Sequence, residues 1–161
     1  MSLEQVWQNF RYRLEQLSAP ADIYGVADKF EFWDHLQHSP DNPARSRLFT
    51  VDWLGAEKEN QVGKSDIVCN LSLRITDHRF RVRVYYNSKL RHEALQRLVL
   101  KDRKAVIAEL RNPAQYNGIS TASPSTDTGL EHRWKETDET TETDTSLVWE
   151  SVWVCTAQET D

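Results

Sequence analysis

Few residues of this 161-residue chain have the types and spacing that catalysis or metal binding requires. The glycine-rich, Walker A, GxSxG and HExxH motifs of nucleotide-binding proteins and hydrolases do not occur in it. His35 and His38 are three residues apart, but two histidines make an incomplete metal site, so we interpret them as surface histidines. Cys69 and Cys155 lack the CxxC spacing of zinc sites and disulfide frameworks. We therefore expect no enzymatic activity, no cofactor and no bound metal.

Two further features could be mistaken for reactive groups. Asp77 and His78 are adjacent, like a catalytic dyad, but they lie between two predicted strand segments, where turn formation is the simpler role. Cys69 has alternating apolar neighbours, which favours a core thiol, because a reactive cysteine needs exposure and a lowered pKa. Neither feature predicts a reaction centre.

The least ordinary local feature is a strand with three arginines. Arg79, Arg81 and Arg83 alternate with apolar residues, so their side chains share one face of a strand at intervals of about 7 Å. Their mutual repulsion favours an anionic surface opposite, although exposed charges can also remain solvated. The candidate complement is an acidic, threonine-rich segment of another copy of the chain. Its carboxylates are Glu136, Asp138, Glu139, Glu142 and Asp144.

This acidic segment lacks the glycine and the D-x-D-x-D-G rhythm of a calcium loop, so we expect a solvated or interface-facing loop. Pairing of the arginine strand with the acidic loop between copies would be heterologous, and a heterologous contact that closes forms a ring. These eight residues are the hypothetical subunit or partner interface.

Charge is distributed unevenly along the chain. The formal net charge is -5, yet residues 74–111 hold eleven Lys and Arg against four acids, a net of +7, which leaves -12 for the rest. Segments of opposite sign can attract within one molecule or between copies, and they can bind separate partners. Nucleic acid is one anionic alternative, with Tyr85 available for stacking. The acidic pI near 5.6 argues against it, because nucleic-acid-binding domains are usually basic.

Hydrophobic periodicity predicts the elements. Three- and four-residue spacing predicts helices at 2–17 and 89–111, and two-residue spacing predicts strands at 48–54, 69–75, 79–86 and 147–155. The last strand is apolar on both faces, so we expect a helix or a neighbouring subunit to cover its second face. Residues 76–78 are expected to be a hairpin turn, 131–134 the start of a strand, and 27–38 either strand or helix. Loops are expected at 39–46, 57–65, 117–129 and 136–146.

These elements predict an α+β fold: an antiparallel sheet of about four to five strands packed against two main helices. With 39% apolar residues and six Trp, the chain can form one core, and we expect a single domain over residues 1–161. Its core would span about 2–156, with a mobile acidic loop at 136–146 and a short tail at 157–161. The N-terminus MSLEQVWQNF lacks an export-signal layout, and no apolar run could span a bilayer, so we expect a soluble intracellular origin.

The order of these segments resembles a known family. An N-terminal helix is followed by RLFTVDWLG, the hairpin ending in HRFRVRVYYN, the helix HEALQRLVLKDRKAVIAELRNPAQYNGI, an acidic Ser/Thr-rich segment and the strand LVWESVWVC. This arrangement is similar to the tail terminator, or tail completion, proteins of long-tailed bacteriophages. The resemblance covers most of the chain in element order and length, with extra residues around 34–47 and in the acidic segment.

The resemblance implies a non-catalytic α+β subunit that assembles into a hexameric ring. Such a ring caps the finished tail tube, stops its polymerisation and offers a surface to the neck proteins of the head. The implied partners are other copies of the chain, the tail tube protein and a neck or head-completion protein, with DNA only as cargo through the lumen and no membrane. The implied location is the virion, with assembly in the host cytoplasm.

Three alternative functions remain open from the sequence. A neck or head-completion protein would form the same kind of ring between different partners. A small cone-shaped α+β ligand-binding protein or enzyme would enclose a pocket lined by Trp and Phe with converging polar groups. A nonspecific nucleic-acid-binding protein would use the arginine strand and bind in a salt-dependent way.

Overall fold

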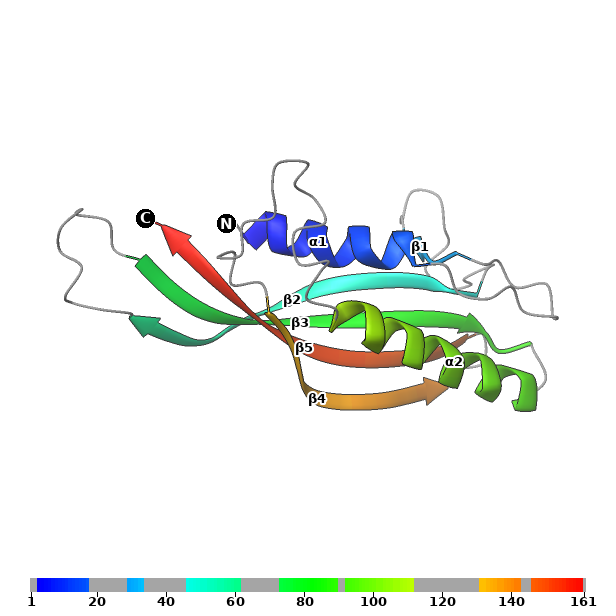
Figure 1. Ribbon diagram of the computed structural model, residues 1–161. Coiled ribbons are helices and arrows are strands. Elements are labelled where there is room, and N and C mark those ends of the chain that lie inside the picture. Colours follow the sequence, from blue (N-terminus) through cyan, green and yellow to red (C-terminus); the bar gives the residue numbers. More distant parts are fainter. Residues whose placement is uncertain are drawn as a thin grey trace.

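The fold of this chain is α+β, with two helices and a five-stranded sheet (Figure 1). The computed structural model describes residues 3–17, 29–33, 46–61, 73–89, 92–111, 131–142 and 146–160. The elements are α1 (Leu3–Gln16), β1 (Glu31–Phe32), β2 (Leu48–Gln61), β3 (Leu73–Asn87), α2 (His92–Leu110), β4 (Glu131–Glu142) and β5 (Ser146–Thr160). The strand order is β1-β2-β3-β5-β4. The predicted fold class is confirmed, although the sheet is mixed because β1 runs parallel to β2.

Both helices pack on the same face of the sheet and form one core with it. The apolar residues of α1 and α2 recur at three- and four-residue intervals, so each helix has one apolar side. The core joins these sides to alternate residues of the strands, which point to one face. Its largest fully buried apolar side chains include Phe10, Phe49, Phe80, Trp149 and Trp153. The predicted helices at 2–17 and 89–111 therefore form as expected, within a few residues.

The predicted hairpin turn at 76–78 is wrong. Residues 73–87 form the single strand β3, which pairs with β2 on one side and with β5 on the other. Asp77 and His78 are strand residues, and His78 is buried, only 3% exposed, on the face that Phe80 shares. Backbone hydrogen bonding to two neighbouring strands outweighs the weak local preference of Asp77 for turns.

Two predicted loops are partly strand. The expected loop at 57–65 is strand as far as Gln61, which pairs with Arg74. The expected acidic loop at 136–146 is the second half of β4 as far as Glu142, paired with β5. Polar and charged residues led to both errors, since they resemble a loop in sequence but are also common on edge strands, where they discourage pairing with other chains. Register shifts interrupt β4 between Trp134 and Asp138.

The long strands extend past the helices at one end of the sheet (Figure 1). In this extension, residues 56–61 of β2, 73–78 of β3 and 155–160 of β5 continue the antiparallel pairing. The ambiguous segment at 27–38 contains the short strand β1. The other predictions for His35, His38, Cys69, Asp144 and the loop at 117–129 lie outside the described residues.

Candidate interaction surfaces

The three arginines of β3 lie on the face of the sheet opposite the helices. Register places Arg79 beside Val154 and Arg81 beside Val152 of β5. Both valines are at most 4% exposed, although they lie outside the helix-covered core cluster. We attribute this burial to the aliphatic stems of the neighbouring side chains, because long basic side chains cover apolar surface while their charges stay near water. The second apolar face of β5 is thus largely buried within one chain.

Asp52 of β2 lies between two of these arginines. Its carboxylate is 3.2 Å from Nη2 of Arg81 and 2.7 Å from Nη2 of Arg83. The three side chains are about one-third exposed, so these ion pairs contribute little to stability. They do relieve the repulsion between Arg81 and Arg83 inside a single molecule. From the sequence we expected the counter-charge in the acidic segment, whereas the carboxylate that contacts Arg81 and Arg83 comes from the neighbouring strand β2.

The acidic residues of β4 are distributed over both faces of the sheet. Asp138 lies on the helix side, where it accepts hydrogen bonds from Nε of Arg103 and from Nε1 of Trp149. Glu139 pairs in register with Glu150 of β5, and Glu142 pairs with Leu147. Glu136 pairs in register with Val152. β5 separates β4 from β3, so no backbone pairing within one chain joins the strand of the predicted basic groups to the strand of the acidic groups.

Sequence reasoning missed a basic surface on α2. The helix side that faces away from the core is exposed and also includes Glu93 and Ala108. We call the basic and large apolar residues of this side, together with the residue that follows the helix, the outer stripe: Arg97, Leu100, Lys101, Lys104 and Arg111. Arg97 forms an i,i+4 ion pair with Glu93 at 2.7 Å, and both side chains are more than 70% exposed. Leu100 is 63% exposed in the middle of these charges. The spacing of the basic residues is visible in the sequence, but their exposure follows only from which side of α2 packs on the sheet.

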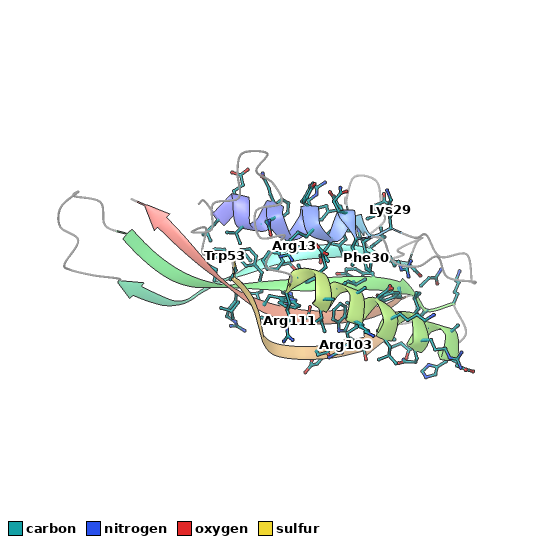
Figure 2. The ribbon with its side chains drawn as sticks, in the orientation of Figure 1. Arg13, Lys29, Phe30, Trp53, Arg103 and Arg111 are labelled. Carbon is teal, nitrogen blue, oxygen red and sulfur yellow. The ribbon has the colours of Figure 1, made fainter. Side chains whose placement is uncertain are left out.

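An exposed tryptophan marks the place where the strands pass beyond the helices (Figure 2). Trp53 is 54% exposed, and its Nε1 donates a 3.3 Å hydrogen bond to Nδ1 of His78. The register between β2 and β3 shifts from Trp53 to Gly55, and Gly55 has a φ of 111°. That backbone conformation suits glycine and few other residues. The bulge thus coincides with an anchored aromatic ring at the surface.

The most strongly buried polar cluster connects α2 to the sheet. Nε and Nη2 of Arg47 each donate a 2.9 Å hydrogen bond to the Asp102 carboxylate, and the Tyr86 hydroxyl donates a third at 3.0 Å. All three residues are at most 1% exposed. Burial raises the pKa of Tyr86 well above its usual value, and the neighbouring Asp102 charge raises this pKa further. Complete burial excludes a substrate from these groups, so the cluster is a structural tie between α2 and β3.

The remaining candidate groups are buried or stand apart from one another among the residues that the structure describes. Cys155 is fully buried in the core cluster. His78 lies outside this cluster but is only 3% exposed. Among the described residues, no three His, Cys, Asp or Glu side chains are grouped to hold a metal ion. Neither α1 nor α2 combines the length and apolarity that crossing a membrane would require. Comparison of the chain with protein-family models found no matching family, and comparison with curated protein sequences found no match.

Proposed function

We propose that this chain is a structural subunit of the tail terminator type, which assembles into a ring, caps a bacteriophage tail tube, ends its polymerisation and joins it to the neck of the head. One observation carries this proposal. Charged surfaces of opposite sign lie on different parts of the subunit, namely the bases on β3 and α2 and the acids on the edge strand β4. Such separation favours head-to-tail contacts between copies.

The strand directions support the same kind of contact. β2, β3, β5 and β4 alternate in direction, so the two outer long strands β2 and β4 run antiparallel to each other. Copies placed side by side would therefore present antiparallel strands to each other at the junction. Such a contact uses different surfaces on its two sides and closes into a ring when the rotation between copies permits.

The interior of the molecule favours a structural role over a ligand-binding one. A cone-shaped binding protein would line a pocket with Trp and Phe side chains. Here Trp149, Trp153 and Phe80 belong to the packed core and are at most 1% exposed. The most buried polar groups, around Asp102, satisfy one another.

In this function, binding and not catalysis stops the growth of the tube. One face of the ring matches the end of the tube, and the other face accepts a neck protein but no further tube subunit. DNA passes through the lumen as cargo, and the ring becomes part of the virion.

Experiments on the purified protein test whether the chain assembles into a ring. Light scattering and negative-stain images are expected to show a ring with a central hole. A protein that remains monomeric at high concentration would contradict the proposal.

Polymerisation of a tail tube protein encoded by the same genome tests whether the ring caps the tube and stops its growth. Added ring protein is expected to shorten the tubes and to be found at one tube end. The matched control is the same tube protein polymerised without the ring protein. A ring that binds neck proteins but leaves tube length unchanged would point to the neck function instead.

A further inference from the structure

We propose that the outer stripe of α2 binds the acidic end of β4, residues 138–142, from a second copy of this chain. This inference rests on the proposed self-assembly and names the contact that drives it. The stripe provides the basic surface, and the second copy provides the carboxylates.

The stripe is an exposed helix face with an excess of positive charge. From Arg97 to Arg111 it is about 21 Å long, by the rise of an α-helix. It carries four bases, and the Glu93 carboxylate beside Arg97 is its one acidic neighbour among the ion pairs described for this helix face. Within the described residues, Lys101 and Lys104 form no ion pair. Their charges are thus available to carboxylates from outside the molecule.

Leu100 gives the stripe an exposed apolar side chain, which distinguishes it from a purely charged, solvated face. Its side chain lies one turn before Arg103 and Lys104 and one turn after Arg97, so basic groups surround it. At 63% exposure it is the most exposed large apolar side chain among the described residues. An apolar centre with a charged rim is the usual composition of a protein interface.

The end of β4 has the complementary composition. All five residues from Asp138 to Glu142 are exposed, and three of them are acids. Between the acids stand Thr140 and Thr141, whose methyl groups can pack against an exposed leucine. The strand is an edge of the sheet, so this segment is accessible to another molecule.

One contact within the chain already has the proposed chemistry. Arg103 of α2, labelled in Figure 2, donates to the Asp138 carboxylate of β4, and Trp149 donates to the same carboxylate. This ion pair uses Asp138 internally, so Glu139 and Glu142 are the carboxylates that remain for the second copy. They point to opposite faces of the edge strand, so a helix that approaches along the strand edge is the arrangement that reaches both. Among the described residues, neither glutamate forms an ion pair.

The arginine strand is the weaker partner for these glutamates. Arg81 and Arg83 already share Asp52, and their side chains are 30% exposed, against 72% for Arg97. A new carboxylate would have to displace Asp52 or approach side chains that are mostly covered. The α2 stripe requires neither change.

Charge reversal tests this contact. Lys101→Glu with Lys104→Glu places two carboxylates at the centre of the stripe and lowers the summed charge of its four basic positions from +4 to zero, whereas Glu139→Lys with Glu142→Lys makes the strand end basic. Each double variant alone opposes like charges, so we expect the dissociation constant of self-association to rise at least about tenfold, measured by sedimentation. Mixed in equal amounts, the two variants restore opposite charges at both kinds of junction, so association is expected to return to within a few-fold of the original.

Two controls separate the contact from misfolding and general charge effects. Circular dichroism should show the unchanged fold in both double variants, because all four positions are exposed. Lys89→Glu changes an exposed lysine outside the stripe and is expected to leave association unchanged. Association of the unmodified chain should weaken as salt concentration rises.

Several results would overturn the inference. Association that persists in the α2 double variant but is abolished by reversal of Arg79, Arg81 and Arg83 would assign the contact to the arginine strand and leave the ring proposal intact. Failure of the mixture to associate would show that the two surfaces do not meet. Loss of retention on double-stranded DNA with unchanged self-association would identify nucleic acid as the occupant of the stripe. An unmodified chain that never self-associates would contradict both proposals.

Discussion

At the scale of single residues, the buried ion pair between Arg47 and Asp102 connects the turn before β2 to α2. Arg47 has a φ of 66°, a conformation that non-glycine residues seldom adopt. Its backbone is held on both sides, because its N–H donates to Tyr85 and its carbonyl accepts from Glu31. The buried guanidinium thus fixes the turn from which β2 begins. Its Cζ also lies 5.7 Å from the ring centroid of Phe30.

Replacing Asp102 with Ala should destabilise the protein strongly. The change leaves the Arg47 charge and the Tyr86 hydroxyl buried without their shared acceptor, which costs about 3–5 kcal/mol in comparable buried pairs. Urea denaturation measures the loss. Asp52→Ala is the control, since its exposed ion pairs should contribute less than about 1 kcal/mol. Similar losses for both variants would contradict the structural role assigned to the buried cluster.

Tyr86 should make stability sensitive to high pH. Its pKa in the folded protein is raised by burial and by Asp102, whereas in the unfolded chain it is about 10. Above that pH the unfolded chain releases the proton first, so the free energy of unfolding falls as pH rises. Below it Tyr86 keeps its proton in both states and adds no pH dependence.

Denaturation of Tyr86→Phe and the unmodified chain between about pH 8 and 11 isolates this contribution from the other tyrosines and lysines, which are common to both proteins. The phenylalanine variant is expected to lose less stability over this range. Parallel curves would show that the hydroxyl is not buried beside Asp102.

At the scale of elements, Arg13 connects the two helices. This α1 residue is 1% exposed, and its Nη2 donates to the backbone carbonyl of Glu109 in the last turn of α2. Carbonyls at a helix C-terminus lack partners within the helix and carry partial negative charge, so a guanidinium there is favourable. The contact holds the end of α2 against α1.

Arg13→Ala should therefore cost about 1.5–3 kcal/mol, the range for a hydrogen bond to a charged group. Arg11→Ala removes an exposed i,i+4 ion pair to Glu15 on the same helix and should cost about 0.5 kcal/mol or less. Thermal or urea unfolding of both variants tests the difference. Equal effects would mean that Arg13 does not hold the helices together.

Asp138 connects the edge strand β4 to α2 and to the core. Asp138→Ala removes the acceptor for Arg103 and for the buried Trp149, so we expect the free energy of unfolding to fall by about 1–3 kcal/mol. The neighbouring Glu139→Ala should change stability by no more than about 0.5 kcal/mol, because its side chain is exposed. If Glu139→Ala proved the more damaging of the two, the assigned orientation of β4 would be wrong.

At the scale of the whole molecule, stability should decrease from the centre of the sheet to its edges. β3 pairs with a strand on each side along its length, and its core-facing residues from Phe80 to Tyr86 are at most 1% exposed. Hydrogen exchange should therefore be slowest at residues 80–86 and faster in β4. Slower exchange in β4 than in β3 would require a different strand order or an assembly that covers the edge.

The sequence by itself determined the helices and strands whose hydrophobic periodicity can be seen among residues close together in the chain. The apolar spacing of α1 and α2, the alternation of β3 and β5, and the α+β class all follow from residues within one or two turns or strand steps of each other. The arginine strand was visible for the same reason, since alternation alone assigns its three side chains to one face.

Tertiary structure decided which charges meet and where strands end. The partners of Asp52 are 29 and 31 residues away, and Arg47 and Asp102 are 55 apart. Sheet register sets the pairs of Asp52, and the packing of α2 on the sheet sets the pair of Arg47 with Asp102; no local pattern contains either. Likewise β3 passes through Asp77 and His78, and β4 continues to Glu142, because neighbouring strands supply hydrogen bonds that outweigh local preference. The exposure of the α2 stripe arose in the same way, from the choice of which helix side packs on the sheet.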